Sequence, residues 1–263
     1  MATIAGEAYV EAVIFRPFLF SETACASYLF GCTTERTLAV VDPHERLVDG
    51  YLAAADEIGS PIVAVFETHV QADHVSGLPA LVAATGAAAY LPAGAGVEFA
   101  HEQLADGDLV ELGNTVVRTI ATPGHAPEHN AYVVADRRRG DEQPWLVFTG
   151  DSLLVGDVGR PDLHAQGAPE PLARELYASI RRLLELPDGV LVYPSHYGGS
   201  VCGRALSGNP FSTIGFERHH NQALVATDVD AFVRELLVDV PPPPAGQAAI
   251  VAQNRSGKIA ART

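Results

Sequence analysis

Histidine and aspartate side chains recur in this sequence directly after short apolar segments, a pattern that could assemble a metal site. One such side chain follows each of four predicted strands, and these are His69, His125, Asp151 and His196. The intervals between them are 56, 26 and 45 residues, so they can meet only through the fold. Strand ends hold ligands rigidly before a metal arrives, and Gly124 and Gly150 would let the chain turn sharply beside two of them. We predict one metal site where these strands end.

Residues 69–74, His-Val-Gln-Ala-Asp-His, add two further polar groups beside the first histidine. Asp73 and His74 lie so close to His69 that they could also take part in the site.

The segment 69–74 resembles the His-x-His-x-Asp-His motif of the metallo-β-lactamase superfamily, with Gln71 where a second histidine is usual. The resemblance continues through His125, Asp151 and His196. It implies an α/β fold, an αββα sandwich of two facing mixed sheets with helices outside. The superfamily's binuclear zinc hydrolases, which include glyoxalase II, would use the position of Gln71 as a ligand. Because a neutral amide is a weak zinc ligand, Gln71 favours a one-metal site. For such a site the resemblance implies His69, His125 and Asp151 as the metal ligands. Asp73, His74 and His196 would then act beside the metal by orienting its ligands or bound groups.

Two histidines and one carboxylate form a facial triad associated with non-haem Fe(II) and oxygen chemistry. The persulfide dioxygenase branch of the superfamily has this ligand set, and segments 148–154, 157–163, 196–203 and 212–215 resemble that branch. The resemblance is strongest to members with an extra rhodanese domain, which we do not expect in this chain. The resemblance to this branch implies one Fe(II) per chain, with zinc as a substitute. It also implies that the protein uses O₂ to oxidise glutathione persulfide or a similar thiol persulfide to sulfite and thiol.

Two alternatives remain open. One is a glyoxalase II-like thioester hydrolase, in which a metal lowers the pKa of bound water to around 7. The other is a non-catalytic sulfur carrier, in which Cys202 holds a persulfide for a separate rhodanese.

Three residues are predicted to contact the substrate. Arg160 would hold a carboxylate of the thiol carrier through a bidentate contact, unless it is a surface arginine. Tyr197 either lines the pocket or packs against the core. Cys202 lies in a glycine-rich turn, where it is either an inert buried thiol or a persulfide acceptor.

The other cysteines and histidines receive no chemical role from the sequence. Cys25 and Cys32 flank a predicted strand and are expected in the core. Five histidines are expected in loops or on the surface, with His129 nearest to the site: His101, His129, His164, His219 and His220.

Alternating strands and helices must position these residues. The predicted strands are 10–19, 27–31, 37–42, 62–68, 88–91, 109–112, 115–121, 130–134, 145–149 and 190–193. The predicted helices are 45–58, a segment from after His74 to Gly86, 171–186 and 228–240, the last with a Thr227-x-x-Asp230 cap. The proline run at 241–244 ends that helix. We therefore expect one catalytic domain at 1–240 and a tail at 241–263 that packs on it.

Composition narrows the class of partner. The 263 residues carry a formal charge of −15 and are 48% hydrophobic, which argues against nucleic acid or an anionic membrane as partner. There is no apolar run of 18 residues and no cationic start typical of a secretory signal. Three scattered cysteines fit a reducing compartment. We expect a cytoplasmic enzyme of sulfur metabolism that forms a homodimer.

Overall fold

The computed structural model describes residues 13–140, 143–165, 167–200, 202–203, 206–226, 228–240, 242–243 and 246–259. These residues form two six-stranded sheets. The first contains, in spatial order, β1 (Val13–Phe20), β2 (Cys25–Cys32), β3 (Thr37–Val41), β4 (Ile62–Phe66), β5 (Ala88–Pro92) and β6 (Glu102–Leu104). The second contains β14 (Ser212–Thr213), β13 (Leu191–Pro194), β10 (Pro144–Gly150), β9 (Asn130–Asp136), β8 (Thr115–Ala121) and β7 (Leu109–Leu112).

Both sheets are mixed. In the first sheet, β1, β2 and β3 pair antiparallel, and β3, β4, β5 and β6 pair parallel. In the second, only β10 and β13 pair parallel. A short hairpin joins β11 (Leu153–Leu154) to β12 (Asp157–Val158).

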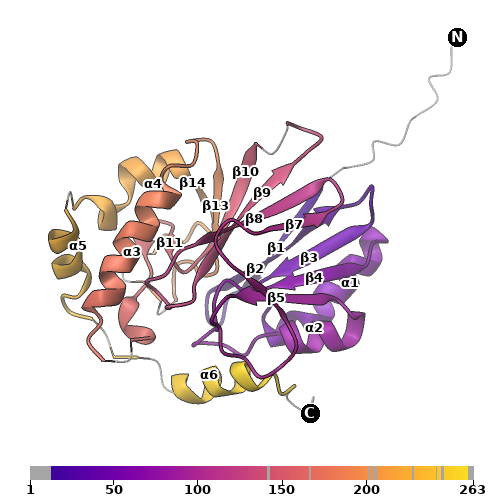
Figure 1. The fold of residues 1–263 in the computed structure, drawn as a ribbon, viewed down its shortest axis with the longest axis horizontal. Coiled ribbons are helices and arrows are strands. Elements are labelled where there is room, and N and C mark those ends of the chain that lie inside the picture. The colour runs from indigo at the N-terminus through magenta and orange to yellow at the C-terminus, as the bar shows by residue number, and fades with distance from the viewer. Residues whose placement is uncertain are drawn as a thin grey trace, which may run out of the picture.

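Helices cover the outer face of each sheet, so the fold has four layers (Figure 1). The helices are α1 (Val48–Ile58), α2 (Leu78–Thr85), α3 (Glu170–Leu183), α4 (Ile214–His220), α5 (Val229–Leu236) and α6 (Gln247–Ser256). Single 3₁₀ turns are η1 (Glu45–Leu47), η2 (Pro161–Leu163) and η3 (Gln222–Leu224). In Figure 1, α1 and α2 lie against the first sheet and α3 and α5 lie on the other side of the molecule. The predicted αββα sandwich is confirmed.

Three apolar clusters fill the spaces between these layers. The cluster between the sheets is rich in aromatic rings, including Tyr28, Phe30, Phe66 and Phe148. A second cluster joins the first sheet to α1 and α2, and a third joins the second sheet to α3 and α5. Each layer thus buries the apolar face of its neighbour, which is what holds such a fold together.

Most elements agree with the sequence prediction, and β7 and β8 have the predicted bounds. The sequence did not predict β6, β11, β12, β14, α4 or α6. The N-cap of α5 is Asp228, whose side chain accepts from the backbone N–H of Ala231 at 2.8 Å. The predicted Thr227 cap was therefore wrong, and Thr227 itself lies outside the described residues, as do 10–12 of the first predicted strand.

Helix α6 lies against the loop that carries the 69–74 segment. The side-chain amide of Asn254 donates to the carbonyl oxygens of Gln71 and His74 at 2.9 Å each, and its oxygen accepts from the backbone N–H of Ser76 at 2.9 Å. Three hydrogen bonds from one buried side chain thus fix the backbone of this loop.

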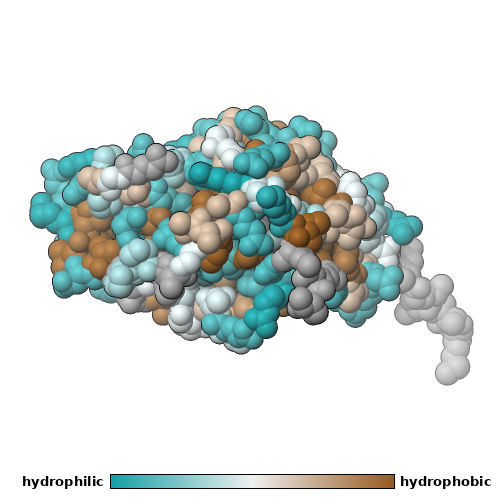
Figure 2. Space-filling view, turned by 90° about the horizontal axis from the view of Figure 1, so that it is seen from below, coloured by the Kyte–Doolittle hydropathy of each residue, from teal (hydrophilic) through white to brown (hydrophobic). Residues whose placement is uncertain are grey.

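Figure 2 shows the face seen from below in Figure 1 as a mixture of hydrophilic and hydrophobic residues. None of the helices in the described part of the chain is both long and apolar enough to cross a membrane.

Candidate metal centre

The four predicted strand ends meet at one edge of the sandwich. His69 follows β4 of the first sheet, whereas His125, Asp151 and His196 follow β8, β10 and β13 of the second. All four residues are at most 1% exposed. The arrangement predicted from the intervals in the sequence is therefore present, and both sheets contribute to it.

Three imidazole rings face one another at this edge. The ring centroids of His69 and His125 are 4.8 Å apart, and the ring of His164 lies 5.0 Å from His125 and 5.8 Å from His69. One nitrogen of each ring lies within 4.8 Å of the others. Nε2 of His125 is also 3.5 Å from Oδ2 of Asp151. The three predicted ligands are thus connected through His125, with His164 as an additional neighbour.

A chain of hydrogen bonds orients His69. Thr68 donates its hydroxyl hydrogen to Oδ2 of Asp42 at 2.9 Å. The hydroxyl oxygen of Thr68 has no second hydrogen to donate, so it accepts from Nδ1 of His69, 2.9 Å away. This assigns the ring proton of His69 to Nδ1 and leaves the lone pair on Nε2. A metal-binding histidine is commonly held in this way by a partner behind it.

Electrostatics keeps these rings neutral. Burial lowers the pKa of His69 well below its usual range, and the neighbouring rings of His125, His129 and His164 lower it further. Burial also lowers the pKa of His125, although Asp151 opposes this, and it lowers the pKa of His164 to about 3. Metals bind the deprotonated imidazole, so the rings are already in the form that coordinates a metal.

His196 joins the two carboxylates of the site. Its Nδ1 is 2.7 Å from Oδ1 of Asp151, and its Nε2 is 2.7 Å from Oδ2 of Asp73. Burial disfavours charge on this ring, but the carboxylates of Asp151 and Asp73 outweigh it and raise the pKa of His196 well above its usual range. His196 is therefore an imidazolium that donates to both carboxylates. Oδ2 of Asp151 is buried and has no hydrogen-bond partner among the described residues.

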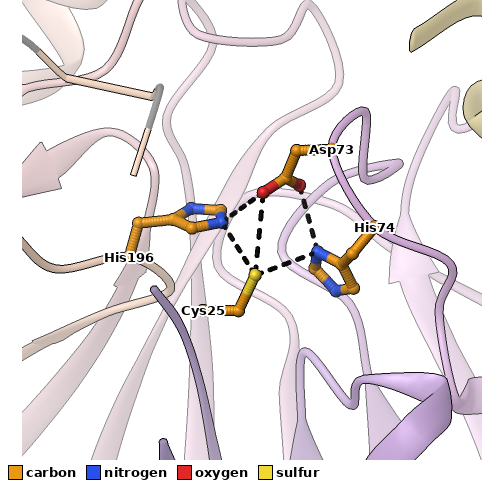
Figure 3. Close-up of side chains that lie close together, drawn as sticks. All are labelled: Cys25, Asp73, His74 and His196. Carbon is orange, nitrogen blue, oxygen red and sulfur yellow. Dashed lines mark hydrogen bonds and ion pairs between the residues drawn. The ribbon is translucent and has the colours of Figure 1, made fainter. Parts of the chain in front are cut away.

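A second polar group surrounds Asp73 and includes a cysteine (Figure 3). Sγ of Cys25 lies 3.4 Å from Nε2 of His196, 3.6 Å from Nδ1 of His74 and 3.7 Å from Oδ2 of Asp73. Burial alone would raise the pKa of Cys25, but His196 and His74 outweigh it and lower the pKa to about 7. Cys25 is buried, as predicted for a core residue, yet it also belongs to the site.

His129 supports Asp151 from behind. Its Nε2 accepts from the backbone N–H of Asp151 at 3.1 Å, and its Nδ1 lies 2.8 Å from the Thr122 hydroxyl. This packing requires glycine at position 150, where φ is +53° and a Cβ atom would lie 2.4 Å from Nε2 of His129. His129 approaches the site, as predicted, but it is buried rather than on the surface, and His164 from the same predicted set lies closer to His125.

The side-chain amide of Gln71 contacts a buried carboxyl group, while its oxygen has no hydrogen-bond partner among the described residues. Its side-chain nitrogen lies 3.4 Å from Oε2 of Glu67, and Ser76 donates to Oε1 of the same carboxyl group. Burial raises the pKa of Glu67 well above its usual range, and Asp42 raises it further. Gln71 therefore belongs to a buried polar group beside the site.

The three predicted substrate residues occupy different environments. Arg160 is buried rather than on the surface, and its guanidinium donates to both carboxylate oxygens of Asp162, at 3.1 and 2.7 Å. Tyr197 is partly buried and packs against the aromatic core between the sheets. Cys202 is 2% exposed and lies in one group with Asp151 and His196. Contact of these residues with a substrate stays a prediction.

The sequence did not identify three members of this region. Cys25 and His164 were assigned to the core and to a loop, and His44 was not considered, although its ring stacks on His74 with centroids 4.9 Å apart. Cys25 follows an exposed turn and His164 follows η2. Neither has a motif at its own position, so the fold alone reveals them.

Comparison with known proteins agrees with this geometry. A family model described as the metallo-beta-lactamase superfamily matches residues 21–196. The crystal structure of a metallo-beta-lactamase from Staphylococcus aureus is 30% identical, with a TM-score of 0.89 over 96% of this chain and 75% of that one. The crystal structure of ETHE1 from Myxococcus xanthus is 33% identical, with a TM-score of 0.80 over 92% of this chain and 98% of that one.

The curated relatives include both persulfide dioxygenases and hydroxyacylglutathione hydrolases. The mitochondrial persulfide dioxygenase ETHE1 of Bos taurus is 28% identical over 70% of this chain and 68% of its own length. A hydroxyacylglutathione hydrolase from Polaromonas is 35% identical over 65% of this chain and 61% of its own length. The two groups carry out different reactions, so the choice between them depends on the site.

Proposed function

The chain belongs to the metallo-beta-lactamase superfamily, and we propose that it is an Fe(II)-dependent persulfide dioxygenase with one iron ion per chain. The substrate would be a low-molecular-weight thiol persulfide such as glutathione persulfide. The overall reaction combines R–S–SH, O₂ and water to give R–SH, sulfite and two protons. Its similarity to persulfide dioxygenases over 70% of the chain supports this proposal.

The proposal rests chiefly on the hydrogen bonds that join His196 to Asp151 and Asp73. The other group of possible metal donors, Cys25, Asp73, His74 and His196, is joined to Asp151 by hydrogen bonds of His196 to Asp73 and Asp151. Gln71 faces Glu67 and offers no imidazole in their place. Among the donors not used in these bonds are the neutral rings of His69 and His125 and the unpartnered Oδ2 of Asp151, with Nε2 of His164 beside them. His69, His125 and Asp151 match the two-histidine, one-carboxylate site of non-haem iron.

Bound Fe(II) would supply the electron transfer that activates O₂, which redox-silent zinc cannot supply. The protein's own contribution is to position groups and manage charge. Thr68 fixes the ring of His69, and His196 holds one oxygen of Asp151 so that the other is directed towards His125. His196 also carries a proton beside the site, which favours binding of a persulfide as its anion.

Substrate-contacting roles for Arg160, Tyr197 and Cys202 are part of the proposal. Arg160 already donates to Asp162, so it would hold a substrate carboxylate either beside that pair or by exchanging partners. A cytoplasmic location, a homodimer and a separate rhodanese as partner are also proposed. The location rests on the three cysteines, which form no disulfide.

A thioester hydrolase is the second candidate, and the similarity to hydroxyacylglutathione hydrolases favours it. The two candidates predict different reactions from the same purified protein. The test is to load the protein anaerobically with Fe(II) or with Zn(II) and to supply glutathione persulfide or S-lactoylglutathione. We expect O₂ uptake and sulfite only with iron and persulfide. Hydrolysis of the thioester with zinc, without O₂ uptake in the iron sample, would contradict the proposal. His125→Ala is the matched inactive control.

A further inference from the structure

His164 is placed as a ligand would be, although no motif predicted it. Its ring is nearly perpendicular to those of His69 and His125, at 79° and 66°. Its Nε2 atom is buried and has no hydrogen-bond partner among the described residues. Burying an unpaired polar atom typically costs about 1–3 kcal/mol, so an atom in this position is expected to have a partner in the working protein.

The spacing of the three rings indicates what that partner is. With metal–nitrogen bonds of about 2.0–2.1 Å, rings that share one metal at angles of 90–120° have centroids roughly 4.5–5.5 Å apart. The observed separations of 4.8, 5.0 and 5.8 Å match this range to within a few tenths of an ångström. One nitrogen of each ring also lies within 4.8 Å of the others, so the three rings are placed to share one ion.

The segment that carries His164 is held in place independently of the metal. Pro161 begins the 3₁₀ turn η2, and the pair between Arg160 and Asp162 lies within the same segment. The backbone of Gly159 is packed against Asp151, because a Cβ atom there would lie 1.8 Å from the carbonyl oxygen of Asp151. His164 is thus brought to the site by contacts that do not depend on its own side chain.

We propose that His164 is a third imidazole ligand of the metal, in addition to His69, His125 and Asp151. This inference rests on the metal site of the proposed function. Four protein ligands leave two of six positions in an octahedral complex for other ligands, compared with three positions for the simple facial triad. A third neutral ligand adds no negative charge, so the site stays attractive to an anionic sulfur ligand.

The number of coordinated histidines can be counted by proton NMR of the Co(II)-substituted protein. Each coordinated imidazole with a protonated second nitrogen gives one strongly shifted N–H signal that disappears in D₂O. We expect three such signals in the natural protein and two in His164→Ala, with unchanged signals in the surface control His219→Ala. We also expect His164→Ala and His164→Gln to weaken Co(II) binding, measured by chelator competition, on the order of tenfold or more.

The outcomes separate this inference from the proposed function. Two shifted signals in the natural protein, with no change in His164→Ala, would overturn the role of His164 while leaving the site of His69 and His125 intact. No shifted signal in the natural protein would overturn the proposed metal site itself. Circular dichroism of each variant establishes that it is folded, so a lost signal reports a lost ligand.

Discussion

His196 donates from Nδ1 to Oδ1 of Asp151 at 2.7 Å, while the second oxygen of that carboxylate lies 3.5 Å from Nε2 of His125. One oxygen of Asp151 is therefore engaged with a charged ring, and the other faces the neutral imidazoles. We propose that this division allows the site to hold a single metal ion.

Replacing His196 should weaken the metal site without removing a proposed ligand. In His196→Gln the charged partner of Asp151 is lost, and loss of a partner that supports a ligand typically costs 10- to 100-fold in metal affinity. We expect a fall of that size in Fe(II) affinity, measured anaerobically by chelator competition. His219→Gln is the control, and equal affinity in the two variants would contradict the role given to His196.

Replacing Gln71 should have little effect on the metal. Its side-chain nitrogen contacts Glu67 and a neutral amide is a weak metal ligand, so Gln71→Leu should keep one iron per chain. Loss of a residue that supports a metal ligand typically lowers activity about tenfold or more. The dioxygenase activity of Gln71→Leu should fall by less than that. Metal analysis and O₂ uptake measure both quantities. Loss of metal together with activity would instead show that the amide is a ligand.

The two cysteines near the site should differ in reactivity. Burial raises the pKa of the Cys202 thiol, whereas His196 and His74 lower that of Cys25 to about 7 against the effect of burial. We therefore expect Cys202→Ser to retain oxidation of free glutathione persulfide. Complete loss of activity in this folded variant would support the sulfur-carrier alternative. Cys25→Ser should change the pH at which the metal-free protein reacts with iodoacetamide.

The metal-free protein should be most stable near pH 6.5. Burial lowers the pKa of His69, His129 and His164, the latter two to about 3. As pH falls below 6.5 the unfolded chain gains protons that these folded rings do not bind. Each such ring then costs up to about 1.4 kcal/mol of stability per pH unit. The raised pKa of Glu67 acts in the opposite sense and offsets part of this loss.

Above pH 6.5 a different pair of rings determines the trend. Despite burial, nearby negative groups raise the pKa of His74 and His196, chiefly Cys25 and Asp73 for the first and Asp151 and Asp73 for the second. Their contribution is fully present below pH 6.5 and is lost as pH rises through their folded pKa. Thermal unfolding from pH 5 to 9 should therefore show a maximum, and His196→Gln should flatten its alkaline side. A melting temperature that rises steadily from pH 6.5 down to 5 would contradict this account.

The strand ends that carry His69, His125, Asp151 and His196 could be predicted because apolar runs and their polar ends are local features of a sequence. The positions of Cys25 and His164 in the site could not be predicted from the sequence. Cys25 meets His196 across 171 residues, and His164 reaches the site from a turn whose own residues form no periodic pattern. Contacts of this kind depend on how the sheets and loops pack. That packing cannot be inferred from the residue type at one position in the sequence. The two-residue strands were missed because they are too short for any alternation to appear.

The central claim is that one iron ion, held at His69, His125 and Asp151, makes this protein a dioxygenase. The most direct measurement is elemental analysis of protein purified without oxygen, combined with O₂ uptake on glutathione persulfide across samples of different iron content. The account predicts that iron saturates at one ion per chain, that activity rises in proportion to it, and that each O₂ consumed yields one sulfite. Two zinc ions per chain, with no O₂ uptake at any iron content, would contradict it.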